Sequence, residues 1–599
     1  MCKELRIKNK RVMKKYISML AAGLMMVSCV DTIILPEDKT VDEDFWKSKS
    51  DVQLMVNGAY RSMLSEAIVS RLIVWGDLRS DELVPSGRQT GALPEDLTEI
   101  NMGNTQDNNE FAEWGAFYTV INNCNMVLER AEEVMSVDPS YTQGDYLADC
   151  SQMLALRSLC YFYLVRNFRD VPYVSQAFMN SSQERNIPQS NPDSVLTACI
   201  ADLEIAEKNA ISASAYTDWR KVGYLTRDGI DALLADIYLW RASVKHSAAD
   251  YEAAIAYCDK VIESKKAQRV VHGGFADLQE YPLYEGNEMF NEMFVAQNGT
   301  ESIFELQYDG NSNANMGVCK YFNHYNNTTN AEPYLFASSI MGYQKEIFHS
   351  TTDNDWRGRY STYNDAVTAG EFEALKVRKY VTNATYLSNT IPANLQSETR
   401  AYSDRYQQNY IIYRLTDVML MKAEALNALA LMLDANNGEG EEGGSLTEQI
   451  NQYVSDAFDL VLAVNSRSNA DSETNPIKLA TYATPAQMEG LILAERLREL
   501  AFEGKRWYDL MRYNYRHAEG VDYTKTLYLL NEEGRANVAT YAPMLDLIKR
   551  KLSGKGEAVV AKLGYENKLY MPIPLKDLSI CPVLHQTPGY SSSDIYEKN

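Results

Sequence analysis

Residues 491–513 read LILAERLRELAFEGKRWYDLMRY, and this stretch is the most informative one for the fold class of the chain. Apolar residues recur in it at three- and four-residue steps, which predicts the buried face of a helix. The helix is expected to begin near Thr484, because Pro485 suits the first helical position and Gln487 completes a capping box with Thr484. We therefore expect one long amphipathic helix over residues 485–513.

Gly504 is predicted to lie on the apolar face of this helix. A glycine there costs about 1 kcal/mol relative to alanine, which predicts that another backbone packs closely against it. A charged stripe runs beside that face, and Glu503 and Arg506 are spaced to pair at i,i+3. Such a stripe is either catalytic or a half-buried ion network that orients a scaffold helix, and we favour the network. The residues of this scaffold signature are Glu499, Glu503, Gly504, Arg506 and Asp509.

The composition of the chain argues against several classes of protein. Its 599 residues exceed what one core usually serves, so a multi-domain body is expected. The excess of 81 acidic over 58 basic residues argues against nucleic acid binding and provides no electrostatic attraction to anionic lipid. The 40 Tyr fit sugar-stacking surfaces as well as packing between helices. The nine Cys form no Cys-x-x-Cys or Cys/His cluster, so no metal site is expected.

The N-terminus has the pattern of an export signal. Residues 13–15 are basic, residues 16–27 form an apolar run, and a small residue followed by Cys29 closes it. The run is too short to span a bilayer, and no later segment is apolar for about 18 residues. We expect residues 1–28 to be a signal peptide, with Met13 as an alternative start, and residues 29–45 to be a tether.

Helical periodicity dominates residues 46–265. A first helix leads into a polar-aromatic turn at 74–83, and loops of this kind often carry binding residues. There, Trp75 is a candidate for stacking on a sugar, and Asp81 and Arg88 are candidates for binding its hydroxyl groups. The alternative is a capped turn with Trp75 in the core. Trp114, at the start of the next predicted helix, is a further ligand-binding candidate.

Later helices in this region are expected to come in pairs. Residues 193–210, 225–240 and 250–262 have helical apolar faces separated by short polar links, which is typical of tetratricopeptide-type repeats. Such pairs bury their faces only by stacking on neighbours, so they form a curved scaffold. The predicted fold is mostly α, with a tetratricopeptide-like scaffold, a large irregular part and a few short strands.

Residues 266–410 form the irregular part, where the helical period fades and aromatic residues, Asn and Gly become frequent. Residues 301–308 alternate like a short strand. Flat rings beside amide side chains suit a neutral carbohydrate, because rings cover its apolar faces and amides bind its hydroxyl groups. For each ring the alternative is a packing position in a loop. The ligand-binding candidates are Tyr284, Tyr308, Tyr321, His324 and Tyr325.

An acidic turn in the same part places two carboxylates two residues apart, at Asp353 and Asp355. Glycoside hydrolysis needs a carboxylate pair spaced across a sugar bond, and the sequence does not provide that spacing. We therefore assign no catalytic residue. Binding of a structural Ca²⁺ by this turn is an open alternative, although the turn lacks the terminal Glu of a full calcium loop. No cofactor is expected.

Residues 411–599 return to helical patterns. A helix over 413–426 is followed by a Gly- and Glu-rich linker at 436–445, and a helix from 446 to about 464 is expected to pair back on the first. This unit again has the build of a tetratricopeptide-type pair. The stretch at 485–513 and an irregular tail complete the region.

Five ordered segments resemble the SusD/RagB family of nutrient-binding lipoproteins of the Bacteroidetes outer membrane. They are residues 495–513, 156–172, 301–308, 413–426 and the tail pieces 569–574 and 582–590. Residues 26–29 also resemble a bacterial lipobox, which implies acylation of Cys29; an ordinary signal peptide with an incidental Cys is the alternative. The chain has Arg169 where the family usually has Gly, Thr416 in place of Ala and Thr587 in place of Asn.

The resemblance implies a lipid-anchored protein on the outer membrane that faces the cell surface. It would bind an oligosaccharide or other nutrient, most often a glycan, and deliver it to a TonB-dependent transporter of the SusC type. The helical scaffold would face the transporter and the aromatic loops the ligand, with no covalent chemistry, so the protein is not expected to be an enzyme. Two alternatives stay open: capture of a peptide or other non-glycan nutrient, and a surface glycoside hydrolase.

Overall fold

The computed structural model describes most of the chain from Phe45 to Tyr590. Its gaps are 88, 180–181, 273–279, 287, 323–332, 342–346, 349–354, 365–374, 381–405, 437–442, 470–471, 519–521, 526, 528–547, 553 and 564–565. Several residues named above lie outside the described part, namely those of the signal peptide and tether with Cys29, and Arg88, His324, Tyr325 and Asp353.

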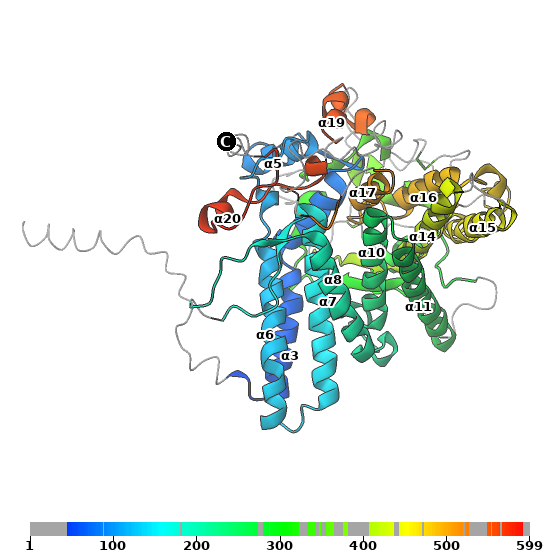
Figure 1. The fold of residues 1–599 in the computed structure, drawn as a ribbon. Coiled ribbons are helices and arrows are strands. Elements are labelled where there is room, and N and C mark those ends of the chain that lie inside the picture. The colour runs from blue at the N-terminus through cyan, green and yellow to red at the C-terminus, as the bar shows by residue number, and fades with distance from the viewer. Residues whose placement is uncertain are drawn as a thin grey trace, which may run out of the picture.

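A row of long helices forms the scaffold of the molecule (Figure 1). In chain order they are α3 (Lys49–Met63), α6 (Gly115–Val137), α7 (Gln143–Phe168), α8 (Pro192–Asn209), α10 (Arg227–Lys245), α11 (Ala248–His272), α14 (Leu415–Asn436) and α15 (Gly443–Ser468). Each helix packs on the next one in this order, and α11 contacts α14 although the irregular part separates them in sequence. The predicted mostly α fold, built from stacked helix pairs, is confirmed.

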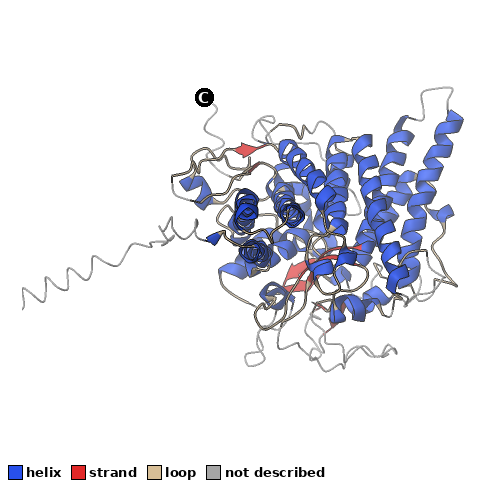
Figure 2. Cartoon of the chain, turned by 90° about the horizontal axis from the view of Figure 1, so that it is seen from below, coloured by secondary structure: helices blue, strands red, loops and turns tan. Residues whose placement is uncertain are grey.

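Short strands pair in two-stranded antiparallel sheets, and Figure 2 shows how small the strand content is beside the helices. The pairs are β1 (Leu83–Pro85) with β5 (Leu335–Ala337), β2 (Val171–Pro172) with β3 (Gln189–Ser190), β4 (Ser302–Leu306) with β8 (Tyr410–Arg414), and β6 (Thr362–Asn364) with β7 (Leu375–Val377). The strand predicted at 301–308 is β4. Its partner β8 leads directly into α14, which ties the irregular part to the scaffold.

Shorter helical elements complete the described part of the chain. They are α4 (Glu66–Ile73), η1 (Val74–Leu78), α5 (Ala92–Asn101), η2 (Glu110–Ala112), η3 (Ala213–Ala215), α9 (Arg220–Gly223), η4 (Asn291–Ala296), α12 (Met316–Phe322), η5 (Ser339–Met341), α13 (Trp356–Ser361), η8 (Leu479–Thr481), α16 (Pro485–Glu499), α17 (Arg506–Arg516), α19 (Gly556–Leu563), η10 (Glu566–Leu569) and α20 (Leu575–Ile580).

The stretch at 485–513 is not one helix, and this part of the prediction was wrong. The capping box at Thr484 and Gln487 is present and starts α16, but α16 ends at Glu499 and α17 begins only at Arg506. Between them, Phe502 and Gly504 have left-handed backbones, with φ of 65° and 71°. The break frees backbone N–H groups that a continuous helix would use internally. Two of them donate to buried carboxylates, Phe502 to Glu82 and Gly504 to Asp77, each over 3.0 Å.

Gly504 therefore lies in a tight turn and not on a helix face, but the predicted close approach of another backbone is confirmed. A Cβ atom added at Gly504 would lie 2.6 Å from the hydroxyl oxygen of Tyr410 and 3.0 Å from the carbonyl oxygen of Leu72. Gly76 in η1 faces the same turn, and a Cβ atom there would overlap the backbone of Gly504. Glycine is needed at both positions because the two segments pack backbone against backbone.

The end of α7 explains how the chain accommodates Arg169 at the position where the resemblance implies Gly. Arg169 directly follows the helix with φ of 64°, a conformation that costs a residue with a Cβ atom roughly 1–2 kcal/mol. Its buried guanidinium group donates to the Glu566 carboxylate over 3.1 Å and to the backbone carbonyls of Lys525 and Asp522 over 2.7 and 3.1 Å. These bonds offset the backbone strain and attach the C-terminal tail to α7.

Candidate functional site

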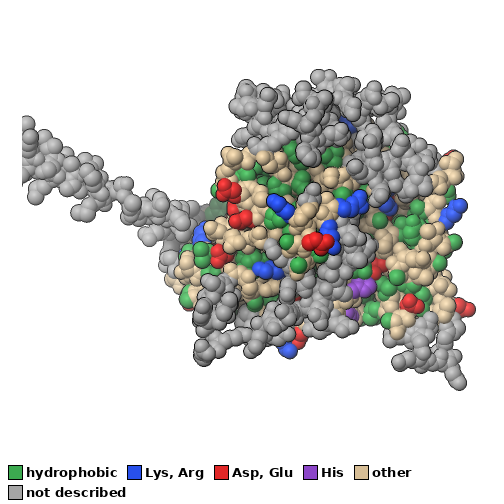
Figure 3. Space-filling model, turned by 90° about the horizontal axis from the view of Figure 1, so that it is seen from above, with side chains coloured by type: hydrophobic (Ala, Val, Ile, Leu, Met, Phe, Trp, Pro, Cys, Tyr) green, Lys and Arg blue, Asp and Glu red, His purple; other side chains and the backbone are tan. Residues whose placement is uncertain are grey.

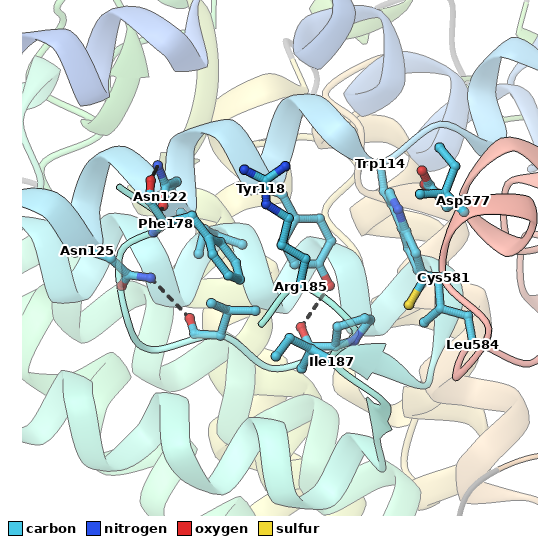
Figure 4. A pocket seen from close by; sticks show the side chains of 14 residues that line it. Trp114, Tyr118, Asn122, Asn125, Phe178, Arg185, Ile187, Asp577, Cys581 and Leu584 are labelled. Carbon is cyan, nitrogen blue, oxygen red and sulfur yellow. Dashed lines mark hydrogen bonds between the residues drawn. The ribbon is translucent and has the colours of Figure 1, made fainter. Parts of the chain in front are cut away.

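An open cavity of about 240 Å³ lies at the start of α6, and Figure 4 shows it from close by. We call it the Trp114 cavity. One wall is α6, a second is the chain that connects β2 to β3, and the third is α20 with the residues after it. The lining residues are Trp114, Tyr118, Ile121, Asn122, Asn125, Pro172, Val174, Phe178, Arg185, Ile187, Asp577, Ile580, Cys581 and Leu584.

Two aromatic side chains of α6 form one end of the Trp114 cavity. Trp114 directly precedes the helix and Tyr118 lies about one turn later, so both point to the same side. Their ring centroids are 5.7 Å apart in an edge-to-face arrangement, and Trp114 also packs against Phe168 at 5.1 Å. The Tyr118 hydroxyl donates to the carbonyl of Pro172 over 2.8 Å. These contacts fix both rings before any ligand arrives.

The amide side chains of α6 hold the second wall in place. Asn122 accepts from the backbone N–H of Phe178 over 2.7 Å and donates to the carbonyl of the same residue over 3.3 Å. Asn125 donates to the carbonyls of Val174 and Gln176 over 3.2 and 3.1 Å. Both amides are therefore engaged by the protein backbone, and their role is to shape the cavity.

Two charged side chains of the cavity, unlike these amides, are available to bind a ligand. The Asp577 carboxylate accepts a hydrogen bond from the Trp114 side chain, but burial outweighs this bond and raises the pKa of Asp577. Arg185 is exposed, and within the described residues its side chain has no hydrogen-bond or ion-pair partner. A carboxylate and a guanidinium group can bind hydroxyl groups, while the rings and aliphatic walls cover apolar faces of a ligand.

A second open cavity of about 610 Å³ lies between residues 280–283 and α15. Its lining includes one aromatic ring, Tyr281, and two carboxylates, Glu280 and Asp459. Burial raises the pKa of Asp459, and nearby Asp456 and Glu280 raise it further. This cavity has a single ring where the Trp114 cavity has several, so the Trp114 cavity is the better candidate for stacking on a sugar.

Trp114 is the one sequence-predicted ligand residue that lines the Trp114 cavity, and the others in the described part serve the core. Trp75 is fully buried, donates to the carbonyl of Phe111 over 2.9 Å and stacks on Phe117 at 5.2 Å. Of the two interpretations of the 74–83 turn, the structure shows the one with Trp75 in the core. Asp81 is buried as well, and both of its carboxylate oxygens accept from Arg506, over 2.9 and 3.0 Å.

The tyrosines predicted from the irregular part are also buried and hold segments together. The Tyr284 hydroxyl accepts from the backbone N–H of Thr300 over 2.8 Å. The Tyr308 hydroxyl donates to the carbonyl of Leu64 over 2.9 Å. Tyr321 is 1% exposed, and its ring meets Phe111 edge to face. In this conformation none of these three rings offers a face to a ligand, because their hydroxyl groups and faces are used in packing.

The scaffold signature forms a buried ion network, as the favoured interpretation predicted. Glu499 accepts from Arg414 over 2.6 Å, from Arg357 over 3.2 Å and from Arg467. Glu503 accepts from Arg414 over 2.8 Å and from Lys379. We call these six residues the Glu499 hub. Burial alone would raise the pKa of Glu499, but the arginines outweigh it and hold that pKa well below its usual range.

The other two charged residues of the signature bind partners that sequence spacing did not reveal. Arg506 pairs with Asp81 and not with Glu503, because the break after Glu499 rotates the two apart. Asp509 accepts from Arg512 over 2.8 Å and from Arg496 over 2.9 Å. The network therefore connects the turn between α16 and α17 to both halves of the chain.

Sequence reasoning missed Tyr118, Arg185 and Asp577 as cavity residues. Tyr118 was detectable, since it stands four residues after the predicted Trp114. Arg185 and Asp577 carried no signal, because Arg185 lies in a loop, Asp577 lies in the short helix α20, and only the tertiary fold brings both to α6. Cys29, Arg88, His324 and Tyr325 lie outside the described residues, so their predicted roles stay predictions.

Two family profiles match the chain. Residues 320–590 match the profile described as "SusD family", and residues 37–239 match the one described as "Starch-binding associating with outer membrane". Among curated relatives, "SusD-like protein P38" of Formosa agariphila is 26% identical over 525 residues, which cover 85% of this chain and 92% of the relative.

Solved structures share the fold. A "SusD homolog" from Bacteroides thetaiotaomicron superposes with a TM-score of 0.65 at 16% identity, covering 92% of this chain and 99% of its own. The structure titled "B. fragilis NanU" superposes with a TM-score of 0.57 at 19% identity, covering 93% of this chain and 99% of its own. These superpositions show that the fold is shared.

Proposed function

As this chain belongs to the SusD family, we propose that it is a surface lipoprotein that binds a nutrient, a glycan above all, and delivers it to a TonB-dependent outer-membrane transporter of the SusC type. One observation carries the proposal: residues 37–239, which include the α6 wall of the Trp114 cavity, match a family described as starch-binding and associated with the outer membrane. The partner transporter is inferred from the family resemblance. We propose that the helical scaffold faces this transporter.

Attachment to the membrane would come from lipid on Cys29. Within the described residues, no helix combines the length and the apolar character needed to cross a bilayer. Several acyl chains on one cysteine make a stable anchor. The body of the protein would then stand at the cell surface, with the tether at residues 29–45 between it and the lipid.

The Trp114 cavity is the proposed place for one part of the glycan. Trp114 and Tyr118 would cover the apolar face of a sugar ring, and Asp577 and Arg185 would bind its hydroxyl groups. Because the rings and walls are already fixed by hydrogen bonds, little side-chain entropy is lost on binding. The mechanism is binding and release, and it needs no bond-breaking step.

Calorimetric titration of the purified protein with linear maltooligosaccharides, followed by other oligosaccharides, tests the proposal. We expect saturable binding of at least one glycan, and at least tenfold weaker binding for Asp577→Asn and Trp114→Ala. Trp219→Ala is the matched control, because Trp219 is 45% exposed and does not line the cavity. If a panel of peptides binds and no glycan does, the non-glycan alternative replaces this proposal.

A reducing-end assay separates binding from hydrolysis. We expect a bound oligosaccharide to stay intact during long incubation with the protein. Release of reducing ends that scales with protein concentration would overturn the binding role and favour a surface glycoside hydrolase.

A further inference from the structure

A small cavity of about 30 Å³, separate from the Trp114 cavity, lies between the end of α5, α17 and the segment around α19. These elements lie together on the upper face of the molecule in Figure 1, and Figure 3 shows Lys and Arg side chains across the middle of that face. We call this cavity the Arg79 pocket. Its polar lining consists of Arg79, Asn101, Thr105, Trp507, Lys551 and Lys568, with the ring of Tyr590.

Arg79 is the central cation of this pocket. One of its terminal nitrogens, Nη2, donates to the carbonyl of Leu569, and the guanidinium carbon lies 4.3 Å from the centroid of the Trp507 ring. The other, Nη1, is buried and has no hydrogen-bond partner. Within the described residues, no carboxylate forms an ion pair with Arg79.

Two further polar atoms in the pocket also lack a partner. Trp507 is 1% exposed, yet its indole Nε1–H donates to nothing. The side-chain oxygen of Asn101, at the end of α5, accepts from nothing. Buried polar groups are normally hydrogen-bonded, because each unmade bond costs about 1–3 kcal/mol. The pocket thus presents two free N–H donors and one free acceptor.

Two lysines also line the pocket. Lys551 Nζ donates to the carbonyls of Leu78 and Ser80 over 2.8 and 2.6 Å. Lys568 Nζ donates to the carbonyl of Gly589 over 3.0 Å and lies 4.0 Å from the centroid of the Tyr590 ring. Burial lowers the pKa of Lys551 to about 7, and nearby Asp81 and Glu82 partly counteract it.

The buried charge of Arg79 is costly without an anion. Burial lowers the pKa of Arg79 to about 10, and the groups that counteract it are the tyrosines Tyr590, Tyr508 and Tyr570. The side chain is therefore still charged at neutral pH. An uncompensated buried cation destabilises the folded state unless a counterion completes the site. An anionic group with two acceptor oxygens fits the two free N–H donors.

We propose that the Arg79 pocket is an anion subsite that receives one carboxylate or sulfate group of an acidic saccharide. The cavity has room for about two waters, so it admits one such group and not a whole sugar ring. Its oxygens accept from Arg79 Nη1 and Trp507 Nε1, and a neighbouring hydroxyl of the sugar donates to the Asn101 oxygen. This inference rests on the proposed function and narrows its ligand class to sugars that carry a negative charge.

Titration of the full mature chain, labelled with ¹⁵N at tryptophan, tests the site directly. The Trp507 indole N–H signal is assigned by its loss in Trp507→Phe. We expect sodium glucuronate or sodium sulfate to shift this signal in a saturable way, and glucose to leave it unchanged at equal concentration. A shift with glucose equal to that with glucuronate overturns the proposal, as does the absence of any shift with both anions.

Variants assign the effect to Arg79. Arg79→Met keeps an unbranched side chain against Trp507 and removes the charge, so anion binding should weaken at least tenfold. Arg220→Met is the matched control, because Arg220 is exposed, pairs with Asp218 and loses the same charge. Equal anion affinity in Arg79→Met and wild type overturns the proposal.

Two further results separate this inference from the proposed function. If neutral oligosaccharides bind and Arg79→Met binds them equally well, while neither anion shifts Trp507, the glycan-binding role stands and the anion subsite fails. If N-acetylaspartate shifts Trp507 as strongly as glucuronate does, the pocket does not select a saccharide, and the acidic-sugar assignment fails.

Discussion

Arg414 and Arg79 are both cationic side chains held inside the molecule, but their surroundings differ. Arg414 has no exposed surface and donates to Glu503 and Glu499 over 2.8 and 2.6 Å within the Glu499 hub. Arg79 donates to one backbone carbonyl, and one of its terminal nitrogens has no partner. The first arginine is balanced by the protein itself, whereas the second is balanced only if a ligand supplies the anion.

The difference indicates how charge serves stability in one region and recognition in the other. In the Glu499 hub, removing one group leaves several others buried and unpaired, which is more costly than the net value of any single pair. In the Arg79 pocket, removing the cation relieves an imbalance. Substitutions of matched size should therefore be costly in the Glu499 hub and nearly neutral or stabilising in the Arg79 pocket.

Arg414→Met should give the largest effect. We expect the free energy of unfolding to fall by about 3–5 kcal/mol, because Glu499 and Glu503 lose a partner that contacts both of them. Urea unfolding followed by circular dichroism measures this change. Arg220→Met, at an exposed pair with Asp218, should leave the midpoint unchanged. Equal midpoints for the two variants would show that the Glu499 hub does not stabilise the folded state.

Gly504→Ala tests whether the hub region is also closely packed. The left-handed backbone at φ of 71° and the 2.6 Å approach to Tyr410 should together cost about 3 kcal/mol. Gly58→Ala is the control, because nothing lies within 4 Å of an added Cβ atom there and alanine favours α3. Chemical denaturation should show a loss for the first variant and a gain for the second. A gain for both would contradict the packing assigned to the turn.

Asp77, between the two regions, should make stability depend on pH. Burial raises the pKa of Asp77 to about 8, and its carboxylate accepts from Gly504 N. Unfolded Asp77 loses its proton near pH 4, so between pH 4 and 8 the folded state binds more protons and its stability falls as pH rises. Each such group contributes up to about 1.4 kcal/mol per pH unit.

Asp77→Asn should reduce this slope, because asparagine still accepts from Gly504 N and does not titrate. Unfolding free energies measured at several pH values between 4 and 8 give the slopes. Asp218→Asn, at an exposed position, is the control and should keep the wild-type slope. Parallel curves for wild type and Asp77→Asn would mean that Asp77 does not control the pH dependence.

Arg79→Met should give the smallest effect. We expect its unfolding free energy to stay within about 1 kcal/mol of wild type or to rise, because the lost bond to Leu569 is offset by removal of an unpaired buried charge. Thermal unfolding without added anions measures it. A loss as large as that of Arg414→Met would show that Arg79 is a structural cation, and the comparison would no longer hold.

The sequence predicted the scaffold well because helix pairs have a local signal. The capping box at Thr484 and Gln487, the strand at 301–308 and the paired helices all follow from spacing within one segment. The break at 499–506 did not, since the residues on either side keep the three- and four-residue apolar spacing across it. Phe502 in a left-handed conformation has no sequence signature, because the carboxylate that stabilises it is Glu82.

The candidate site was less predictable, for the same reason. Tyrosine composition does not distinguish a ring that meets solvent from one whose hydroxyl binds a backbone carbonyl, as in Tyr308. Trp114 was identified, but Asp577 reaches it from the opposite end of the chain. The unpaired state of Arg79 is a property of its neighbours in space, and no spacing rule shows it.

The hydrogen bond from Gly504 to Asp77 joins positions that are 427 residues apart, and it has a consequence for how the chain folds. Contacts of such long range form slowly, because closing the long intervening chain costs entropy before the contact can stabilise it. During synthesis the helices of the N-terminal half emerge while the Asp77–Glu82 turn still lacks the backbone donors of Gly504 and Phe502. A chain truncated before Glu499 lacks both donors, so Asp77 and Glu82 make these two bonds only after the C-terminal half has been synthesised.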